Sequence, residues 1–276
     1  MDVFALHRGT APLLISLPHD GSEIPDALAA RMTPEARHAP DTDWFVSRLY
    51  AFGHALGASV LIPRYSRYVI DLNRPPDDVS LYPGQNTTGL CPTVRFSGDP
   101  VYRPGEQPDA DEIAQRVETY WRPYHDALRG ELERLRARHP RVLLWEGHSI
   151  RGELPFLFDG RLPDLNLGTA SGASCDASVQ ARIETALRAQ NAYDWVVNGR
   201  FKGGYITRRY GDPSQGVDAV QLEIAQRIYM DERTGRWRDD LAAAAGDAIR
   251  GLVTAALSAR PAISRALDRG GRGHVS

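Results

Sequence analysis

Two histidines that each follow a run of apolar residues constrain the fold of this chain more than any other feature. His19, in Pro18-His19-Asp20-Gly21, comes after residues 13–17, and His148, in Glu146-Gly147-His148-Ser149, comes after residues 142–145. Short apolar runs of this kind are typical of buried strands. Open α/β sheets bind their ligands beyond the carboxyl ends of their strands. We therefore expect both histidines at one edge of a sheet, in a metal site.

The size and charge of the chain exclude several classes of protein. Its 276 residues suffice for one large α/β domain or two small ones, and a hydrophobic content of 42% is ordinary for a soluble protein. The net charge of −2 offers no basic footprint for nucleic acid. No apolar run reaches membrane-spanning length, and the N-terminus lacks a secretory signal. With Cys91 and Cys175 as reduced thiols, we expect a cytoplasmic protein.

Predicted strands and helices alternate along the chain. This alternation predicts a three-layer α/β sandwich, in which helices cover both faces of a mostly parallel sheet. We expect one domain over residues 1–265 and a disordered Gly/Arg-rich tail over residues 266–276. Strands or extended segments are predicted at 11–17, 59–63, 67–72, 141–146, 163–168, 193–197, 204–209 and 218–224, and helices at 25–30, 43–56, 110–138, 176–190 and 237–258.

Residues 73–110 are rich in proline and glycine and show little periodicity. A stretch of this length inside a compact domain is usually functional or disordered. Its interspersed apolar residues, such as Leu90 and Phe96, argue against disorder. We therefore expect an ordered loop near the site, with residues 75–105 acting as a cover. The long helix that follows should kink at Pro123.

Acidic residues elsewhere complete a candidate metal site. A zinc hydrolase needs about three protein ligands and a separate carboxylate that transfers protons. Asp41 and Asp43 open the predicted helix 43–56, and Glu223 lies in an apolar stretch where a carboxylate is costly unless it is paired or functional. The alternatives are that the aspartates only cap the helix, that the histidines are surface residues, and that Glu223 faces solvent.

Arginines flank two further segments and indicate an anionic substrate. Arg67 and Arg74 bracket the run 68–72, and Arg200 lies in a glycine-rich turn after residues 195–197. Arginine binds carboxylates through two parallel hydrogen bonds. The alternative is internal pairing, such as Arg67 with Asp71 or Arg74 with Asp77. The glycines match no phosphate-binding motif, which argues against a nucleotide cofactor.

A nucleophilic hydrolase is a weaker alternative. Neither Ser149 nor Ser174 lies in a Gly-x-Ser-x-Gly elbow. Nothing near Cys175 in the sequence favours a thiolate.

The motifs together resemble those of the N-formylglutamate deformylase (N-formylglutamate amidohydrolase) family. The resemblance extends from about residue 11 to residue 258. It rests on Pro18-His19-Asp20-Gly21, Asp41-Thr42-Asp43-Trp44, Ser66-Arg67-Tyr68-Val69-Ile70-Asp71-Leu72-Asn73-Arg74-Pro75-Pro76, Leu81-Tyr82-Pro83-Gly84, Trp121-Arg122-Pro123-Tyr124-His125, Gly147-His148-Ser149-Ile150-Arg151, residues 161–169, residues 198–208 and Val220-Gln221-Leu222-Glu223.

This resemblance implies a fold like that of the zinc-dependent exopeptidases, with a central mixed sheet between helices, and it also implies an activity. The activity is hydrolysis of the linear amide bond of N-formyl-L-glutamate to formate and L-glutamate, a late step of bacterial histidine degradation. His19 and His148 are then ligands of Zn²⁺ or another divalent ion. Asp43 is the preferred third ligand, with Asp41 as the alternative and otherwise the helix cap. Glu223 becomes the catalytic carboxylate.

The resemblance also implies a binding site for the two carboxylates of the substrate. We assign them to Arg67, Arg74 and Arg200, with Asn73 and Asn198 as amide partners. Glu146 and His125 are candidates for supporting the metal ligands from behind.

Two departures from the family pattern stand out. Glu146-Gly147 replaces an aspartate–alanine pair before His148, and Asp218 stands where a histidine is often found. A longer carboxylate at position 146 can still orient His148, whereas Asp218 is expected to bear on substrate choice or proton handling. The alternatives are therefore a hydrolase of another N-acyl acidic amino acid and a metal-free binding protein for glutamate-like ligands. The sequence indicates neither the native metal nor the oligomeric state.

Overall fold

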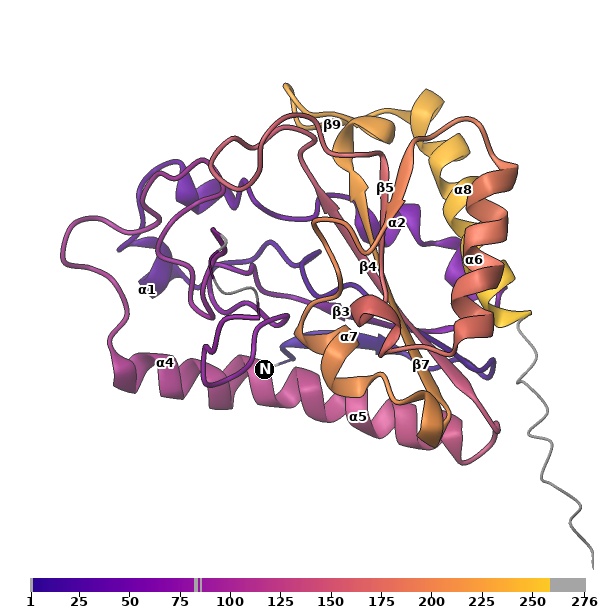
Figure 1. Cartoon of the computed structure of the whole chain (residues 1–276). Coiled ribbons are helices and arrows are strands. Elements are labelled where there is room, and N and C mark those ends of the chain that lie inside the picture. Colours follow the sequence, from indigo (N-terminus) through magenta and orange to yellow (C-terminus); the bar gives the residue numbers. More distant parts are fainter. Residues whose placement is uncertain (1, 82–83, 85, 259–276) are drawn as a thin grey trace, which may run out of the picture.

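A mixed sheet of seven strands lies at the centre of the computed structural model, which describes residues 2–81, 84 and 86–258 (Figure 1). The strand order is β1-β3-β2-β4-β7-β5-β6, with β1 and β5 antiparallel to their neighbours β3 and β7. The predicted α/β class with a mostly parallel mixed sheet is confirmed. The strands are β1 Phe4–His7, β2 Leu13–Ser16, β3 Ser59–Pro63, β4 Val142–Ile150, β5 Leu165–Gly168, β6 Trp195–Val197 and β7 Val217–Ala225.

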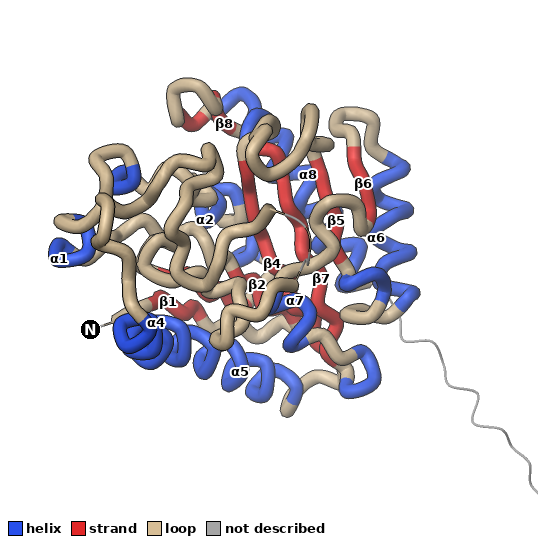
Figure 2. The backbone as a smooth tube through the Cα atoms, turned by 60° about the vertical axis from the view of Figure 1, so that its left-hand side comes forward, coloured by secondary structure: helices blue, strands red, loops and turns tan. Residues whose placement is uncertain are grey.

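Helices cover both faces of this sheet (Figure 2). On one face α6 (Ala177–Ala189) and α8 (Asp239–Leu257) pack on alternate strand residues such as Trp145 and Leu222. On the other face α5 (Arg122–Arg136) packs on the intervening residues, among them Leu144 and Ala219. This alternation follows from the period of two of a β-strand. None of the described helices combines the length and the apolar character that a membrane span requires.

The remaining elements are short and mostly lie in the connections. They are α1 Asp26–Ala29, η1 Ala36–His38, α2 Val46–Leu49, α3 Phe52–Ala55, α4 Ala110–Arg116, η2 Val117–Trp121, η3 Ala170–Gly172, α7 Tyr205–Tyr210, η4 Pro213–Gln215, η5 Gln226–Ile228 and a small hairpin of β8 Met230–Asp231 with β9 Arg236–Trp237.

The prediction of a strand over residues 204–209 was wrong, because this segment forms helix α7. The first-turn amides of a helix have no partner within it and seek acceptors elsewhere. Here the Ile206 N–H donates to Asn73 Oδ1, and the Thr207 N–H donates to Glu146 Oε2. Both acceptors come from distant parts of the chain, so tertiary contacts stabilise this helix.

The prediction of one capped helix over residues 43–56 was also wrong. Two short helices, α2 and α3, occupy this stretch, and Phe45 before α2 has a positive φ of 64°. Asp41 does not cap either helix, because its Oδ2 accepts hydrogen bonds from Tyr68 Oη at 2.6 Å and Phe96 N at 2.8 Å. Residues 67–72 form turns instead of the expected extended segment.

The predicted long helix around Pro123 contains a π-helical stretch. The π-helix η2 joins α4 to α5, and Pro123 lies in the first turn of α5. Proline has no N–H to offer to the preceding turn, so a widened turn is a natural way to include it.

The loop over residues 73–110 is ordered where it is described. Leu90, Phe96, Val101 and Tyr102 are all buried, which fits the prediction of a packed loop. The predicted disordered tail, residues 266–276, lies outside the described residues.

Candidate active site

Three buried side chains converge where the carboxyl ends of β2 and β4 meet. His19 follows β2, His148 lies near the end of β4, and Asp43 precedes α2. His148 Nδ1 lies 3.1 Å from His19 Nδ1 and 3.0 Å from Asp43 Oδ2, and His19 Nδ1 lies 3.7 Å from Asp43 Oδ2. Ligands at typical Zn–N and Zn–O lengths around a tetrahedral centre are about 3.3 Å apart. These three atoms therefore fit one small divalent ion.

The structure brings together His19, Asp43 and His148 and keeps Asp41 away from them. These three residues can offer ligand atoms that all lie within 4.8 Å of one another. The carboxylate of Asp41 points instead at Tyr68 and Phe96. Asp43 is therefore the aspartate whose position suits a ligand.

A carboxylate holds the outer nitrogen of each histidine. Asp71 Oδ1 lies 2.7 Å from His19 Nε2, and Glu146 Oε1 lies 2.7 Å from His148 Nε2. With a metal ion bound, such a pair would keep the proton on Nε2 and leave the lone pair of Nδ1 for the ion, and it would raise the basicity of the histidine. Glu146 also accepts hydrogen bonds from Asn73 Nδ2 and from the amide and hydroxyl of Thr207.

Sequence reasoning missed Asp71, which it considered only as a partner for Arg67. Oδ1 of Asp71 also accepts the Asn73 N–H at 2.8 Å, while the buried Oδ2 has no hydrogen-bond partner among the described residues. An acidic residue directly after the apolar residues 68–70 was the available signal.

Asp43 and Asp71 stay ionised despite their burial. Burial alone would raise the pKa of Asp43, but Arg67 and the two histidines bring it below its ordinary value. Burial is likewise outweighed at Asp71, where His19 and Arg74 lower the pKa. Burial opposes a charge on His148, yet the hydrogen bonds that its ring donates to Asp43 and Glu146 raise its pKa to about 10. The centre as a whole attracts positive charge.

Glu223 faces this centre from the neighbouring strand. It is paired in register with His148 across β4 and β7, and it lines the same pocket as His19 and His148. Burial and the nearby Asp43 raise its pKa to about 8, against the lowering effects of His148 and Arg67. A carboxyl group with a pKa near the working pH can both accept and donate a proton.

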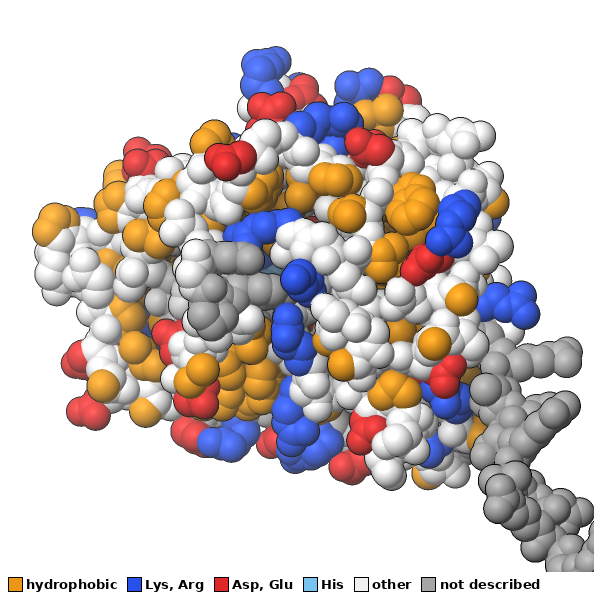
Figure 3. Space-filling model, viewed as in Figure 1, with side chains coloured by type: hydrophobic (Ala, Val, Ile, Leu, Met, Phe, Trp, Pro, Cys, Tyr) orange, Lys and Arg blue, Asp and Glu red, His pale blue; other side chains and the backbone are white. Residues whose placement is uncertain are grey.

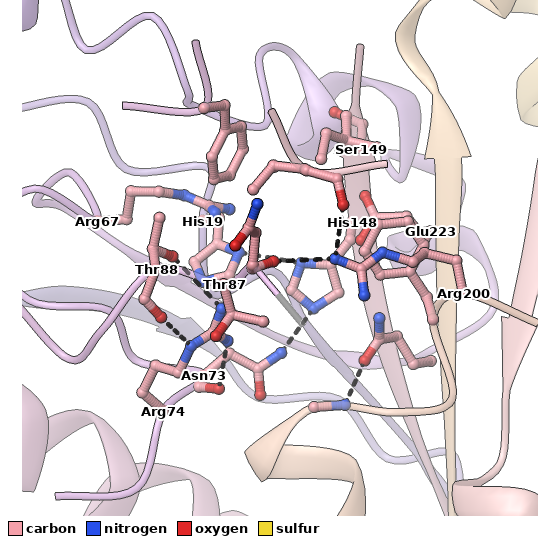
Figure 4. A pocket seen from close by; sticks show the side chains of 17 residues that line it. His19, Arg67, Asn73, Arg74, Thr87, Thr88, His148, Ser149, Arg200 and Glu223 are labelled. Carbon is pink, nitrogen blue, oxygen red and sulfur yellow. Dashed lines mark hydrogen bonds between the residues drawn. The ribbon is translucent and has the colours of Figure 1, made fainter. Parts of the chain in front are cut away.

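The pocket in front of the histidines is lined by three arginines (Figure 4). Arg74 donates to Thr88 O at 2.8 Å and to Asn73 O at 3.1 Å. Arg200 donates to the carbonyls of Asn86 at 3.0 Å and Leu157 at 3.1 Å. Hydrogen bonds to main-chain carbonyls thus hold the guanidinium groups of Arg74 and Arg200 at the pocket. A guanidinium group is a suitable partner for a carboxylate.

Arg67 has a different environment. Its Nη2 donates to Asp43 Oδ1 at 2.8 Å, and its guanidinium lies 4.8 Å from the centre of the Phe96 ring. The internal pair considered from the sequence, Arg67 with Asp71, is replaced by this contact with Asp43. Arg67 therefore holds the oxygen of Asp43 that faces away from the histidines.

Three other predicted site residues lie differently from their expected roles. Asn73 lines the pocket, but its side chain is bonded to Glu146 and to Ile206 N. Asn198 is outside the pocket, because its amide group holds a turn through Thr169 N at 2.9 Å and Thr169 Oγ1 at 2.9 Å. His125 contacts Leu72 O and Tyr210 Oη, and so does not touch the metal-site histidines directly.

The two departures from the family pattern have local structural explanations. Asp218 lies near the start of β7, roughly 17 Å along the strand from Glu223. It forms a two-pronged ion pair with Arg141, so the expected effect on substrate choice has no basis in its position. A Cβ at Gly147 would lie 2.7 Å from Leu17 Cδ2 and 2.8 Å from Tyr50 Cζ, which explains the absence of a side chain there.

None of the alternative nucleophiles is activated. Ser149 Oγ bonds to Tyr229 Oη at 2.7 Å, and Ser174 Oγ donates to Ala219 O at 2.7 Å. Burial raises the pKa of the Cys175 thiol to about 12, and both cysteines are free. A thiolate at Cys175 is therefore disfavoured.

We expect Asp71→Asn to weaken zinc binding by about 10–100-fold, because a neutral amide replaces the charged partner of His19. Competition titration with a coloured chelator measures this affinity. Asp218→Asn is the matched control, since it also removes a buried, paired carboxylate but lies far from the pocket. Equal zinc affinities of the two variants would contradict the orienting role of Asp71.

A family profile and two relatives all indicate one family for this chain. The profile of the N-formylglutamate amidohydrolase family matches residues 11–230. The N-formylglutamate deformylase of Pseudomonas aeruginosa is 51% identical over 258 residues, covering 93% of this chain and 97% of the relative. The N-formylglutamate deformylase of Pseudomonas putida is 49% identical over 257 residues, covering 93% and 96%.

Solved structures show the same fold. The crystal structure of N-formylglutamate amidohydrolase from Ralstonia eutropha JMP134 matches with a TM-score of 0.77 and 25% identity, covering 93% of this chain and 96% of that one. A gene product of Agrobacterium tumefaciens matches with a TM-score of 0.68 and 20% identity, covering 92% and 95%.

Proposed function

The chain belongs to the N-formylglutamate amidohydrolase family, and we propose that it hydrolyses N-formyl-L-glutamate to formate and L-glutamate with the help of a divalent metal ion. The observation that carries the proposal is the convergence of His19, Asp43 and His148 beside Glu223 at the bottom of an arginine-lined pocket. Two nitrogen donors and one carboxylate are a ligand set that Zn²⁺ accepts, so zinc is our first candidate. When bound, such an ion polarises a carbonyl group and makes a nearby water molecule more acidic.

Glu223 is the proton carrier in this proposal. Its carboxylate accepts a proton from the water molecule that attacks the formyl carbon. The same group then gives the proton to the departing nitrogen of glutamate as the C–N bond breaks. Its pKa of about 8, raised mainly by burial, supports both halves of this transfer.

Arg74 and Arg200 bind the two carboxylates of the substrate. Both line the pocket, and their hydrogen bonds to the carbonyls of Thr88 and Asn86 hold the guanidinium groups in place there. Arg67 keeps Asp43 in place and adds positive charge beside the reacting carbonyl. Figure 3 shows Lys and Arg side chains in a line that runs down the middle of the view, which would favour the approach of a dianion.

The loop over residues 75–105 contributes to the pocket in this proposal. Asn86, Thr87, Thr88 and Phe96 from its described part line the cavity. A covered site excludes competing water, which strengthens the interaction of the arginines with carboxylates. The two free, buried cysteines fit our proposal of a cytoplasmic location.

Replacing Arg74 or Arg200 with Met is expected to raise KM about 10–100-fold, because each variant loses a charge-assisted contact with a substrate carboxylate. The two KM values should rise with little change in metal content. Arg129→Met is a matched control, since Arg129 is exposed on α5, where it pairs with the neighbouring Asp126 and Glu133, and does not line the pocket. Unchanged KM values for Arg74→Met and Arg200→Met would remove both residues from the substrate site.

A panel of related amides tests the choice of substrate. The proposal predicts the highest kcat/KM for N-formyl-L-glutamate, with lower values for N-acetyl-L-glutamate and N-formyl-L-aspartate. Preference for an acetyl group would instead assign another N-acyl acidic amino acid. Tight binding without turnover at full zinc loading would indicate a binding protein.

A further inference from the structure

An aromatic pair on the long helix contacts the backbone of the segment that supports the metal site. Trp121 ends the π-helix η2, and His125 follows one turn later on α5. Their rings stack with centres 3.7 Å apart and planes inclined by 24°. π-helical turns occur frequently at functional sites, because they redirect side chains that a regular helix would place elsewhere.

Both rings donate hydrogen bonds to residues 71–74. His125 Nε2 lies 2.9 Å from the carbonyl oxygen of Leu72, and Trp121 Nε1 donates to the carbonyl oxygen of Arg74 at 3.0 Å. The carbonyl between them, that of Asn73, accepts the N–H of Tyr205 at 3.4 Å. The segment is not part of a strand, so these side-chain contacts replace the hydrogen bonds that a sheet would supply.

Every residue flanking Leu72 in this segment supports the site. Asp71 holds His19 Nε2, and Asn73 bonds to Glu146 beside His148. Arg74 extends into the substrate pocket. A shift of the Leu72 carbonyl would therefore move the partners of both histidines together.

The same ring of His125 also contacts helix α7. A carbonyl can only accept, so Nε2 of His125 carries the proton. Burial lowers the pKa of His125 to about 3, so the ring is neutral and its Nδ1 accepts the hydroxyl of Tyr210 at 3.0 Å. Tyr210 ends α7, whose first turn donates to Glu146 through Thr207 N at 3.0 Å. The buried imidazole of His125 thus links the segment 71–74, which carries Asp71, to helix α7, which donates a hydrogen bond to Glu146.

We propose that His125 and Trp121 are positioning residues with separate tasks. His125 fixes Asp71 and Asn73, and through them the orientation of His19 and His148. Trp121 holds the backbone of Arg74 through its carbonyl oxygen. It thereby positions the Arg74 side chain for binding a substrate carboxylate. This inference rests on the proposed function, since the metal site and the substrate give the two tasks their meaning.

The test uses His125→Phe, which keeps the stacking on Trp121 but removes both ring nitrogens. We expect zinc affinity, measured by chelator competition, to fall about tenfold, by analogy with the loss of a partner behind a metal ligand. We expect kcat to fall with it while KM stays near the wild-type value. His125→Gln, which retains an N–H donor of similar reach, should recover most of the affinity.

For Trp121→Phe we expect the opposite changes in zinc affinity and KM. It removes the donor to the Arg74 carbonyl but keeps an aromatic ring against His125. KM for N-formyl-L-glutamate should rise several-fold with zinc affinity unchanged. A split of this kind between the two variants separates the two tasks.

Leu132→Ala is the control for a loss of packing alone, because Leu132 is a buried apolar residue on the same helix, about two turns beyond His125, and its side chain has no hydrogen-bonding group to offer to residues 71–74. It should lower Tm without changing zinc affinity or KM. If His125→Phe behaves like Leu132→Ala, the positioning role is overturned. If the wild-type protein itself neither binds zinc nor releases formate, the proposed function fails instead, so the two failures can be told apart.

Discussion

Replacing Glu223 with Gln is expected to lower kcat for N-formyl-L-glutamate by about 10²–10⁴-fold while leaving metal content and KM close to wild type. The amide has nearly the shape of the carboxylate but cannot take a proton from water. Because Glu223 is not one of the three converging donors, the metal site should remain intact. Steady-state kinetics combined with metal analysis of the same preparation measures both quantities.

The pH profile adds a second readout for Glu223. The carboxylate must be ionised to accept a proton, so kcat/KM should rise with pH through the pKa of this group. That pKa is raised by burial to about 8, and a bound cation would lower it, which places the rising limb at or below pH 8. The limb should disappear in Glu223→Gln.

Glu131→Gln is the matched control for this experiment. Glu131 is a buried carboxylate on α5 that pairs with Arg134 and Ser59, away from the pocket. Its replacement should leave the pH profile and kcat unchanged. A Glu223→Gln variant that retains wild-type turnover would exclude Glu223 as the proton carrier.

Replacing Asp43 with Asn is expected to abolish tight metal binding and, with it, turnover. The change removes the only carboxylate among the three converging donors and leaves the guanidinium of Arg67 buried without its ion-pair partner. Breaking one side of a buried ion pair costs about 3–5 kcal/mol, so the unfolding free energy should fall by a similar amount. Zinc titration and denaturant unfolding of the metal-free protein measure the two effects separately.

Asp41→Asn is a closely matched control, since it makes the same change two positions away. Asp41 accepts hydrogen bonds from Tyr68 and Phe96 and takes no part in the converging group. We expect this variant to keep its zinc and its activity, with a loss of about 1 kcal/mol in stability. Loss of zinc from Asp41→Asn and not from Asp43→Asn would reverse the assignment.

Local pattern was sufficient to predict the strand ends that carry His19, His148 and Glu223. Each follows or lies within a short apolar run, and the carboxyl ends of parallel strands meet at one edge of a sheet. The sequence alone could not choose between Asp41 and Asp43, because both precede a helix and both suit its positive end. The choice depends on contacts with distant segments, because Asp41 accepts hydrogen bonds from Tyr68 and Phe96 whereas Asp43 N donates to the carbonyl of His19.

Contacts between distant segments account for what the sequence did not predict. Residues 204–209 fold as a helix because Asn73 and Glu146, far away in the chain, accept its first amides. Asp71 looked like a partner for Arg67 because the two are close in sequence, whereas its partner in the structure is His19. Asn198 seemed suited to a substrate, yet its amide group stabilises a local turn.

Formate release from N-formyl-L-glutamate by the purified protein, before and after chelation and after addition of zinc, tests the central claim most directly. The account predicts turnover that disappears on chelation and returns with zinc, in proportion to the metal bound at a single site per chain. Full activity in chelated, metal-free protein would contradict the role of His19, Asp43 and His148. Absence of formate at full zinc loading would contradict the proposed reaction.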